Sequence, residues 1–409
     1  MSTKRRSFLR NAGGAAVGLS AAPPNAGAQT AAKPLRIGLI GCGTRGTADA
    51  ATAADLGRSG ENVTITAVCD IYQPRLERAA TRFAAKYYQR SQELAQSPEV
   101  DAVIVATPDR HHVAHALQAI RAGKDVYCEK PIAHWQQFDQ VKELVREVRR
   151  SGRVFQMGTQ RLADPIWRQA AEFIRRGEIG KPAHVQMGYC RRGDSGERGM
   201  PIDDPNAKPG VGLDWEAFLG DAPSQPFSLS RFFQWRLFMD YSGGPCTDND
   251  VHFLALMVKA LGVKFPSRVA ALGGTYVYKT DAEREVPDTF DLIVQYPEGL
   301  NFTFLGTYAN DTPVETVIRG NEGTLRLAEA GLVSEPLAGL RHPRREVPHL
   351  NVGAEHMRDF IRCVRTREKP QGDIELAYHV QTLITMAMRS YVEGKVASFD
   401  AASEQIRLG

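Results

Sequence analysis

Residues 35–46 read LRIGLIGCGTRG, an apolar run that ends in a glycine-rich turn. The run has the length and composition of a buried strand, and Gly41, Gly43 and Gly46 have the spacing G-x-G-x-x-G. Glycines at this spacing allow a tight turn and a close approach of the backbone to a phosphate, which the N-terminus of a following helix attracts. The stretch therefore predicts the strand, turn and helix that open a dinucleotide-binding domain.

Three further apolar runs follow at intervals that leave room for helices. They read NVTITAVCD at 62–70, DAVIVATP at 101–108 and KDVYCEKP at 124–131, with helical patterns between them at 73–87 and 110–123. Strands that are apolar throughout and alternate with helices predict a parallel sheet covered on both faces. We therefore expect an α/β fold in which residues 33–157 form a doubly wound Rossmann domain.

The pattern changes after residue 157. The later part contains, in order, a helical pattern at 165–176, a strand-like run at 184–189, a loop-rich stretch at 191–240, a helix from near Asn249, strand-like runs between 267 and 327, and helical patterns at 356–367 and 374–394. The turns Pro-Glu-Gly and Asn-Glu-Gly between the strand-like runs favour a mainly antiparallel sheet. Residues 158–409 are therefore expected to form a second α/β domain, and a loop-rich stretch of such length is typical of a functional region.

The first 30 residues differ from the rest in composition. They begin with a basic stretch that contains Arg5 and Arg6, continue with the small apolar run NAGGAAVGLSAA, and reach an A-x-A triplet at residues 26–28. This order is that of a signal peptide, and the arginine pair resembles the twin-arginine export signal, with a disordered basic arm as the alternative. Residues 1–30 are therefore expected to engage the twin-arginine export machinery, and the mature protein is expected to be periplasmic or otherwise exported.

Composition and charge exclude some classes of partner. The chain has 409 residues, of which 43% are hydrophobic and 24% charged, and its formal net charge is +4. This balance is ordinary for a globular protein, and no basic stripe interleaved with aromatic residues is visible, so nucleic acid is not an expected partner. The six cysteines show neither a C-x-x-C pair nor a zinc-binding spacing, so we expect no metal site.

An acidic residue supports the dinucleotide site. Asp70 ends the second apolar run, at about the separation of 20 residues from the glycine turn that is expected for a carboxylate binding the ribose diol. A carboxylate there repels a 2′-phosphate, so NAD is the expected cofactor and NADP the less favoured one. Arg75 leaves this choice open, because one nearby arginine sometimes accommodates the phosphate.

Two motifs stand where the third and fourth predicted strands end. Residues 106–112 read ATPDRHH and residues 126–131 read VYCEKP, and ligands of open α/β sheets bind outside such strand ends. Further matching segments are GTQR at 158–161, LDWEAFLG at 213–220, RFFQWRLFMDYSGG at 231–244, TDNDVH at 247–252 and GNEGTLRL at 320–327. Together they resemble the glucose-fructose oxidoreductase, inositol dehydrogenase and rhizopine-catabolism family (Gfo/Idh/MocA), in its exported branch.

The resemblance implies a Rossmann domain followed by an α/β domain whose open sheet commonly mediates oligomerisation, so a homo-oligomer is expected. The expected cofactor-binding residues are Gly41, Cys42, Gly43, Thr44, Arg45, Gly46, Asp70, Thr107, Pro108, His112, Glu129, Lys130 and Gln160.

The resemblance also implies catalytic roles for Lys130, Asp248 and His252. Oxidation of an alcohol requires a base for the hydroxyl proton, and histidine suits that task near neutral pH. If the segment is helical, Asp248 and His252 lie one turn apart, so the carboxylate can orient the imidazole and favour its charged form, while Lys130 can donate to the substrate oxygen. The alternatives are an N-cap for Asp248, a core position for His252 and a solvated strand end for Lys130.

The sequence defines the residues that bind substrate less clearly than those that bind the cofactor. Asn249 and Asp250 depart from the family pattern, and the extra carboxylate binds a substrate hydroxyl or a cationic group, or caps the helix. The residues expected to line a sugar pocket are Arg231, Trp235, Arg236 and Tyr241, half of which can equally belong to the core.

The expected function is NAD-dependent oxidoreduction at a sugar, glycoside or polyol hydroxyl, with a tightly retained cofactor. A glycoside hydrolase or lyase that works by transient oxidation and elimination is the alternative, because it uses the same residues. A binding protein without turnover is a third possibility, which Lys130, Asp248 and His252 disfavour.

Overall fold

Six parallel strands form the first sheet of this computed structural model, which describes residues 33–193, 200–278, 283–328, 331–336 and 351–409. The predicted export signal lies outside these residues. The strands are β1 (Leu35–Ile40), β2 (Val63–Cys69), β3 (Lys86–Tyr88), β4 (Ala102–Val105), β5 (Asp125–Glu129) and β6 (Phe155–Gly158). Their order is β3-β2-β1-β4-β5-β6, so the direction of winding reverses between β1 and β4. The predicted doubly wound sheet is confirmed, and its reversal point is where such sheets bind ligands.

Helices cover this sheet. They are α1 (Thr44–Leu56), α2 (Gln73–Phe83), α3 (Ser91–Gln96), α4 (Asp109–Arg121) and α5 (Phe138–Ser151), with a π-helical turn, η1, at Gly57–Glu61. The prediction that α2 continues to residue 87 is wrong, because Ala84 adopts a left-handed conformation with φ 49° that ends the helix, and β3 follows.

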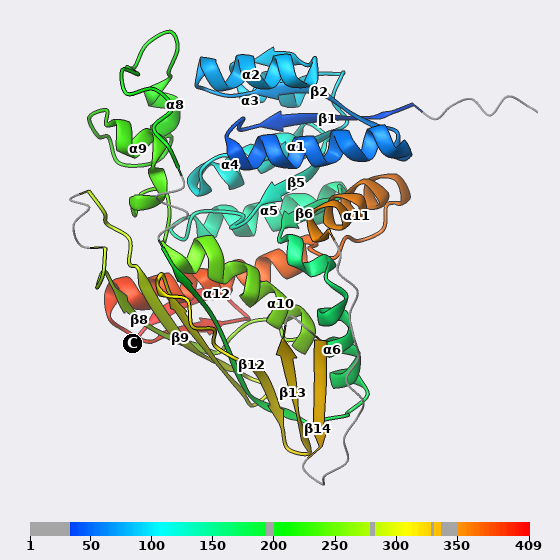
Figure 1. The fold of residues 1–409 in the computed structure, drawn as a ribbon, viewed down its shortest axis with the longest axis vertical. Helices are drawn as coiled ribbons and strands as arrows, with labels where there is room; N and C mark the ends of the chain where they lie inside the picture. Colours follow the sequence, from blue (N-terminus) through cyan, green and yellow to red (C-terminus); the bar gives the residue numbers. More distant parts are fainter. Residues whose placement is uncertain (1–32, 194–199, 279–282, 329–330, 337–350) are drawn as a thin grey trace, which may run out of the picture. The chain divides into compact units, whose positions relative to one another are not determined.

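The last part of the chain returns to this sheet. Helix α11 (Val352–Thr366) packs against α1 (Figure 1). Its Phe360 lies in the same hydrophobic cluster as Ile37 and Leu39 of β1. A helix that follows the boundary predicted at residue 157 therefore packs on the first sheet's side of that boundary.

The second sheet has ten strands and is mainly antiparallel, as predicted. They are β7 (Pro182–Arg192), β8 (Arg268–Gly274), β9 (Thr289–Tyr296), β10 (Leu300–Thr307), β11 (Ala309–Asn310), β12 (Thr316–Gly320), β13 (Gly323–Ala328), β14 (Gly331–Pro336), β15 (Ala397–Asp400) and β16 (Gln405–Leu408). The order is β14-β13-β12-β7-β10-β9-β8-β15-β16, with β11 beside β7, and β7 runs parallel to β10.

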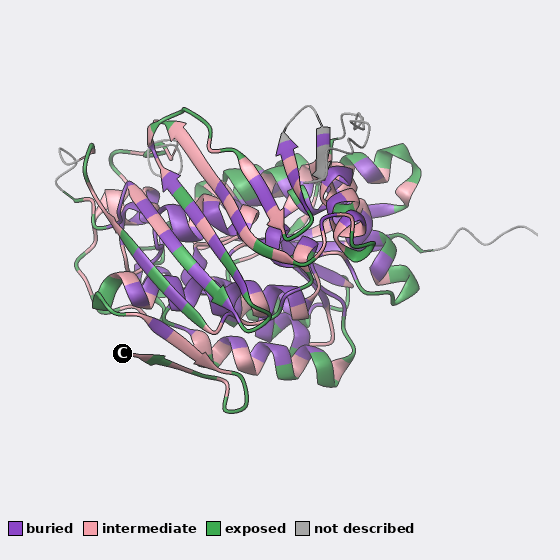
Figure 2. Cartoon of the chain, turned by 90° about the horizontal axis from the view of Figure 1, so that it is seen from below, coloured by how far each residue is buried: buried purple, intermediate pink, exposed green. Residues whose placement is uncertain are grey.

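One face of the second sheet is covered and the other is open. Helices α6 (Pro165–Arg175), α10 (Val251–Leu261) and α12 (Ile374–Glu393) contact its strands or one another. Buried and exposed residues alternate along the strands, as Figure 2 shows, and the outer face carries the exposed side chains of Leu272, Ile293 and Leu305. Among the described helices none is long and apolar enough to cross a membrane.

The loop-rich stretch has a core of its own. It contains the short helices α8 (Trp215–Leu219) and α9 (Leu229–Phe233) and the 3₁₀ turn η3 (Trp235–Leu237). Their aromatic rings form one buried cluster with Tyr72, which follows β2, and with Tyr241. Aromatic packing therefore orders this stretch beside the first sheet.

Two short turns precede longer helices. The 3₁₀ turn η2 (Gln160–Ala163) precedes α6, and the π-helical turn η4 (Cys246–Asp250) precedes α10.

Asp250 lies between η4 and the second sheet. Its side chain is fully buried, and the Cβ position of Gly306 on β10 is 3.1 Å from its Oδ2. Neither carboxylate oxygen has a hydrogen-bond partner among the described residues. Burial, followed by the charges of Asp248 and Asp291, raises the pKa of Asp250 well above its usual range. The carboxylate therefore neither caps α10 nor faces the substrate, contrary to the alternatives drawn from the sequence.

Replacing Asp250 with asparagine is expected to stabilise the fold near pH 8 by about 1–3 kcal/mol, because it removes a carboxyl group that ionises in the unfolded chain but stays protonated in the folded one. The unfolded chain ionises this group above about pH 4, whereas the folded chain, with its raised pKa, keeps it protonated. The cost of Asp250 therefore grows as pH rises, and urea unfolding of both proteins at pH 5 and pH 8 measures it.

The matched control is Asp139→Asn, because the Asp139 side chain is 92% exposed. This variant is expected to leave the unfolding free energy nearly unchanged. A stabilisation by Asp250→Asn that is equal at both pH values would contradict the assigned cause.

Candidate active site

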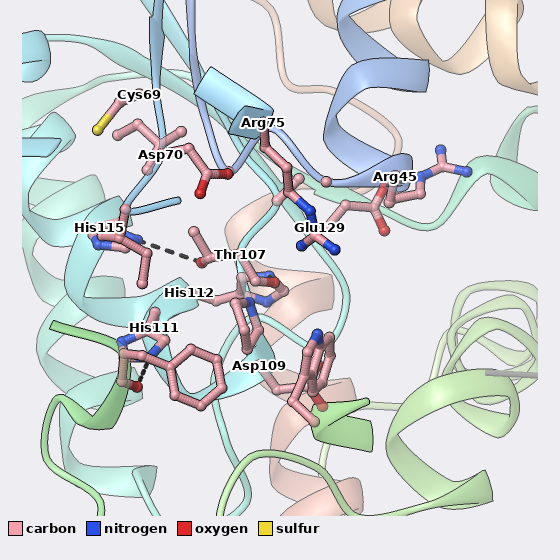
Figure 3. Close-up of a pocket in the computed structure, with 18 of the residues that line it drawn as sticks. Arg45, Cys69, Asp70, Arg75, Thr107, Asp109, His111, His112, His115 and Glu129 are labelled. Atoms are coloured by element: carbon pink, nitrogen blue, oxygen red, sulfur yellow. Dashed lines mark hydrogen bonds and ion pairs between the residues drawn. The ribbon is translucent and has the colours of Figure 1, made fainter. Parts of the chain in front are cut away.

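A cavity of about 740 Å³ lies at the carboxyl ends of the first sheet's strands, where its order reverses. This volume is within the range of about 300–1,000 Å³ that small-molecule and cofactor sites occupy. The sequence-predicted residues that line it are Gly41, Gly43, Thr44, Arg45, Asp70, Thr107, Pro108, Glu129, His112, Lys130, Gln160, Trp235, Arg236, Asp248 and His252. The structure thus brings most of the predicted set together, and Figure 3 shows part of it.

The glycine turn leaves room on one side and is tightly packed on the other. Gly41 has φ 94°, and a Cβ there would lie 2.6 Å from the carbonyl oxygen of Ala106. A Cβ on Gly46 would lie 2.0 Å from the oxygen of Gly41, whereas the nearest atom to a Cβ on Gly43 is 3.8 Å away. Gly41 and Gly46 therefore fix the turn, and Gly43 keeps open the space that a pyrophosphate requires. These residues fit a dinucleotide.

Asp70 is held in place by the backbone. Its Oδ2 accepts a hydrogen bond from the N–H of Cys42 at 2.7 Å, and its Oδ1 accepts one from the N–H of Tyr72 at 2.8 Å. Burial raises the pKa of Asp70, but these donors and the charge of Arg75 favour the ionised form. Each oxygen keeps a lone pair for a ribose hydroxyl. Cys42 thus acts through its backbone, while its side chain is buried.

The carboxylate of Asp248, which lines the cavity, pairs with two cationic side chains. The Nζ of Lys130 lies 3.0 Å from its Oδ1, and the Nε of Arg236 lies 3.1 Å from the same oxygen. Burial alone raises the pKa of Asp248, but the charges of Lys130 and Arg236 outweigh it and hold the pKa well below its usual range. The Lys130 and Asp248 side chains are each 10% exposed, so neither the N-cap nor the solvated strand end describes them.

His252 lines the cavity one helical turn after Asp248, as predicted. Its Nδ1 is buried and has no partner among the described residues. Burial, followed by the charge of Lys130, lowers the pKa of His252 to about 3, although Glu129 and Asp248 act in the opposite direction. Asp248 favours the charged imidazole, as expected, but burial and the charge of Lys130 outweigh it, so the ring is neutral.

A polar network forms the wall behind the glycine turn. Arg45 forms an ion pair with Asp49, and its Nε lies 3.2 Å from the Oε1 of Glu129. The same oxygen accepts a hydrogen bond from the Nε2 of Gln160 at 2.6 Å. Burial raises the pKa of Glu129, but Arg45 and Lys130 outweigh it and lower the pKa to about 2. Burial raises the pKa of Asp49 well above its usual range. Arg45 and Glu129 thus neutralise each other and give the cavity a fixed wall.

His112 connects the two strand-end motifs. Its Nδ1 lies 2.6 Å from the carbonyl oxygen of Pro131, and its Nε2 lies 2.7 Å from that of Thr107. Burial lowers the pKa of His112 to about 4, so the neutral ring donates to one of these oxygens. The side chain therefore holds the ends of β4 and β5 at a fixed separation.

Asp109 and His111 also line the cavity but were not among the predicted site residues. Asp109 is 4% exposed, and burial raises its pKa to about 7 against the charges of Arg236 and Lys130. The Nε2 of His111 lies 2.8 Å from the carbonyl oxygen of Phe218. Both residues belong to the motif ATPDRHH, so their neighbours Thr107 and His112 were the available signal.

The predicted substrate wall divides into two pairs. Trp235 and Arg236 line the cavity, with the guanidinium of Arg236 4.1 Å from the centre of the Trp235 ring. Arg231 instead pairs with Asp240 and Glu285.

Tyr241 is fully buried, and its ring centre lies 4.8 Å from that of Phe218. The structure therefore corrects the substrate contacts expected of Arg231 and Tyr241, since ion pairing and aromatic packing occupy them. The described residues contain no group of three or more metal-ligating side chains placed to hold an ion.

Comparisons with known proteins agree with this geometry. Residues 35–159 match the NAD-binding Rossmann fold of the Gfo/Idh/MocA oxidoreductase family, and residues 200–407 match its C-terminal alpha/beta domain. The inositol 2-dehydrogenase of Acidothermus cellulolyticus is 35% identical over 159 residues, 38% of this chain and 45% of that protein. The match therefore spans less than half of that relative.

Two further proteins share longer stretches. The myo-inositol 2-dehydrogenase of Thermotoga maritima is 26% identical over 252 residues, 58% of this chain and 70% of that protein. The structure of levoglucosan dehydrogenase with NADH and levoglucosan has the same fold, with a TM-score of 0.70 and 18% identity over 90% of this chain and 99% of that one. Because the family's two domain models match residues 35–159 and 200–407, this chain belongs to the Gfo/Idh/MocA oxidoreductase family.

Proposed function

We propose that this protein is an NAD-dependent oxidoreductase that acts on a hydroxyl group of a sugar, glycoside or polyol and keeps its cofactor tightly bound. The observation that carries this proposal is the position of Lys130, Asp248 and His252 in the same cavity as the glycine turn and Asp70. The inositol dehydrogenases and the levoglucosan dehydrogenase among its relatives support the substrate class.

The glycine turn and Asp70 would hold the cofactor, and NAD supplies a hydride acceptor when it is bound. The ammonium of Lys130 is placed to donate to the substrate oxygen, which favours loss of the hydroxyl proton. Neutral His252 lines the same cavity and would accept that proton through its imidazole. Asp248 pairs with both Lys130 and Arg236, so these cations are held in place in the buried site.

The variants Lys130→Ala and His252→Ala are each expected to lower turnover by about 10²- to 10⁴-fold, because each removes a positioned proton donor or acceptor. Steady-state assays with polyols and sugars measure turnover, and mass spectrometry of the denatured protein measures bound NAD. Bound NAD is expected to persist in both variants.

The control variant is His184→Ala, on β7 of the second sheet, where His184 contacts Arg319. Its turnover is expected to equal that of the unmodified protein. Near-normal turnover in a folded Lys130 or His252 variant would refute the role assigned to that residue.

Retention of the cofactor is supported by a segment that lies over the cavity. Met200, Pro201 and Asp214 line the cavity. The N–H of Gln73 donates to the carbonyl oxygen of Gly212 at 3.0 Å, and the N–H of Asp214 donates to that of Ile71 at 3.1 Å. Opening this side of the cavity requires breaking these bonds, which favours slow release of the cofactor.

Export through the twin-arginine pathway is the second part of the proposal, and it rests on Arg5, Arg6 and the segment that follows them. In an exported protein a retained cofactor is not renewed from a cytoplasmic pool. Each hydride taken from a substrate then returns to the same molecule or to an acceptor sugar, and the net reaction is redox neutral.

Stopped-flow absorbance in the reduced-nicotinamide band is the test of this cycle. With substrate and no added NAD, we expect reduced cofactor to form and decay while several turnovers are completed. Activity that requires stoichiometric added NAD would refute retention and leave the oxidoreductase assignment intact.

Asp109 favours oxidation followed by elimination as a second candidate function. Simple oxidation uses one base, which His252 provides, whereas elimination of an aglycone needs another group to exchange a proton. Asp109 is a buried cavity residue with a pKa raised by burial to about 7, which suits such an exchange. Product analysis of glycosides incubated without added NAD distinguishes the two: a free aglycone indicates elimination, and a keto-sugar indicates net oxidation.

We also propose that the outer face of the second sheet joins copies of this chain. Leu272, Ile293 and Leu305 are 77%, 53% and 38% exposed on neighbouring strands β8, β9 and β10. These side chains place apolar surface on three neighbouring strands of the open face, on either side of Asp291, which lies opposite Leu272 and Leu305. Ile293→Asp is therefore expected to reduce the molar mass measured by light scattering, and an unchanged mass would exclude this face.

A further inference from the structure

Arg75 is held by an acid from a distant part of the chain. Its Nε lies 2.7 Å from the Oδ2 of Asp203, and the Nη2 of Arg78 lies 3.3 Å from the same oxygen. The side chains of Arg75 and Asp203 are only 19% and 17% exposed. The guanidinium of Arg75 also lies 5.4 Å from the centre of the Phe233 ring, which further limits its movement.

This ion pair lies beside the expected ribose position. Arg75 lines the main cavity together with Asp70, and its Nη1 is 3.8 Å from the Cβ position of Gly43 (Figure 3). Arg75 and Asp203 also line a second cavity of about 530 Å³, which shares Gly43 and Thr44 with the main cavity. The basic residues in its wall are Arg75, Arg78 and Arg82.

The arginines beside the glycine turn are groups that bind phosphate, but the carboxylate of Asp203 already pairs with Arg75 and Arg78. Arginines beside a glycine turn and a helix N-terminus bind phosphate, and an arginine after the second strand is the group that accepts the 2′-phosphate of NADP. Burial raises the pKa of Asp203, but the hydrogen bonds and charges of Arg75 and Arg78 together outweigh this and hold the pKa below its usual range. The acid is therefore charged when it pairs with the arginines.

We propose that Asp203 is a specificity-determining residue that excludes NADP by occupying the guanidinium of Arg75. A 2′-phosphate next to Asp70 would need this guanidinium and would meet the negative charge of Asp203 instead. Asp70 and Asp203 thus oppose NADP in different ways: Asp70 repels the phosphate, and Asp203 removes the arginine that would compensate. The inference rests on the proposed use of NAD.

The test is competition between the two dinucleotides for the full-length purified protein. Each protein is incubated to equilibrium with equal excesses of NAD and NADP, desalted and denatured, and the released dinucleotides are quantified by mass spectrometry. Asp203→Asn is expected to shift the NADP-to-NAD ratio toward NADP by about tenfold or more, because one like charge is removed and Arg75 is released.

A double variant identifies the arginine as the cause. Adding Arg75→Gln to Asp203→Asn is expected to return the ratio close to that of the unmodified protein. The control for charge alone is Asp204→Asn, since the Asp204 carboxylate accepts a hydrogen bond from the N–H of Asn206 at 2.8 Å, and its ratio is expected to stay unchanged.

The outcomes separate this inference from the proposed function. A ratio unchanged by Asp203→Asn, or a shift that persists without Arg75, overturns the role of Asp203 and leaves the NAD-dependent function in place. Binding of neither dinucleotide by the unmodified protein overturns both. A preference of the unmodified protein for NADP overturns the role of Asp203 and the NAD preference together.

Discussion

The ionised carboxylate of Asp248 is the group on which the rest of the site depends. It holds Lys130 from the end of β5 and Arg236 from the loop-rich stretch, and it lies in the turn that leads into α10. Removing one partner of such a buried pair typically costs about 3–5 kcal/mol, because the remaining charge keeps its desolvation cost. The pair therefore fixes the first sheet, the loop-rich stretch and α10 around one oxygen.

The same ion pairs determine the protonation of the site. Lys130 lowers the pKa of both Asp248 and His252, so the acid is charged and the imidazole is neutral. A charged imidazole could not accept the proton of a substrate hydroxyl. Burial is thus the main reason that His252 is neutral.

Local patterns were sufficient to predict the first sheet and the groups at its strand ends. The glycine spacing, Asp70 and the strands β1, β2, β4 and β5 follow from residues close in sequence. Two short strands were missed: β3 has three residues, two of which lie in the segment predicted as a helix at 73–87, and β6 lies outside the four apolar runs.

The remaining differences between the predicted and the observed site depend on contacts between residues far apart in the sequence. Arg231 and Arg236 have similar sequence surroundings, but Arg231 meets Glu285 while Arg236 meets Asp248. Asp250 also follows Asp248 closely, yet it faces the second sheet at Gly306. Such choices depend on which partner the fold brings near, and residue type alone does not reveal them.

A short segment connects the two ends of the cavity. Met200 lies 3.0 Å from the Nη1 of Arg236 through its Sδ, and its carbonyl oxygen accepts a hydrogen bond from Gln234 at 3.2 Å. Three residues later, Asp203 pairs with Arg75 beside the glycine turn. Residues 200–203 therefore contact Arg236, which pairs with Asp248, and Arg75 beside the glycine turn.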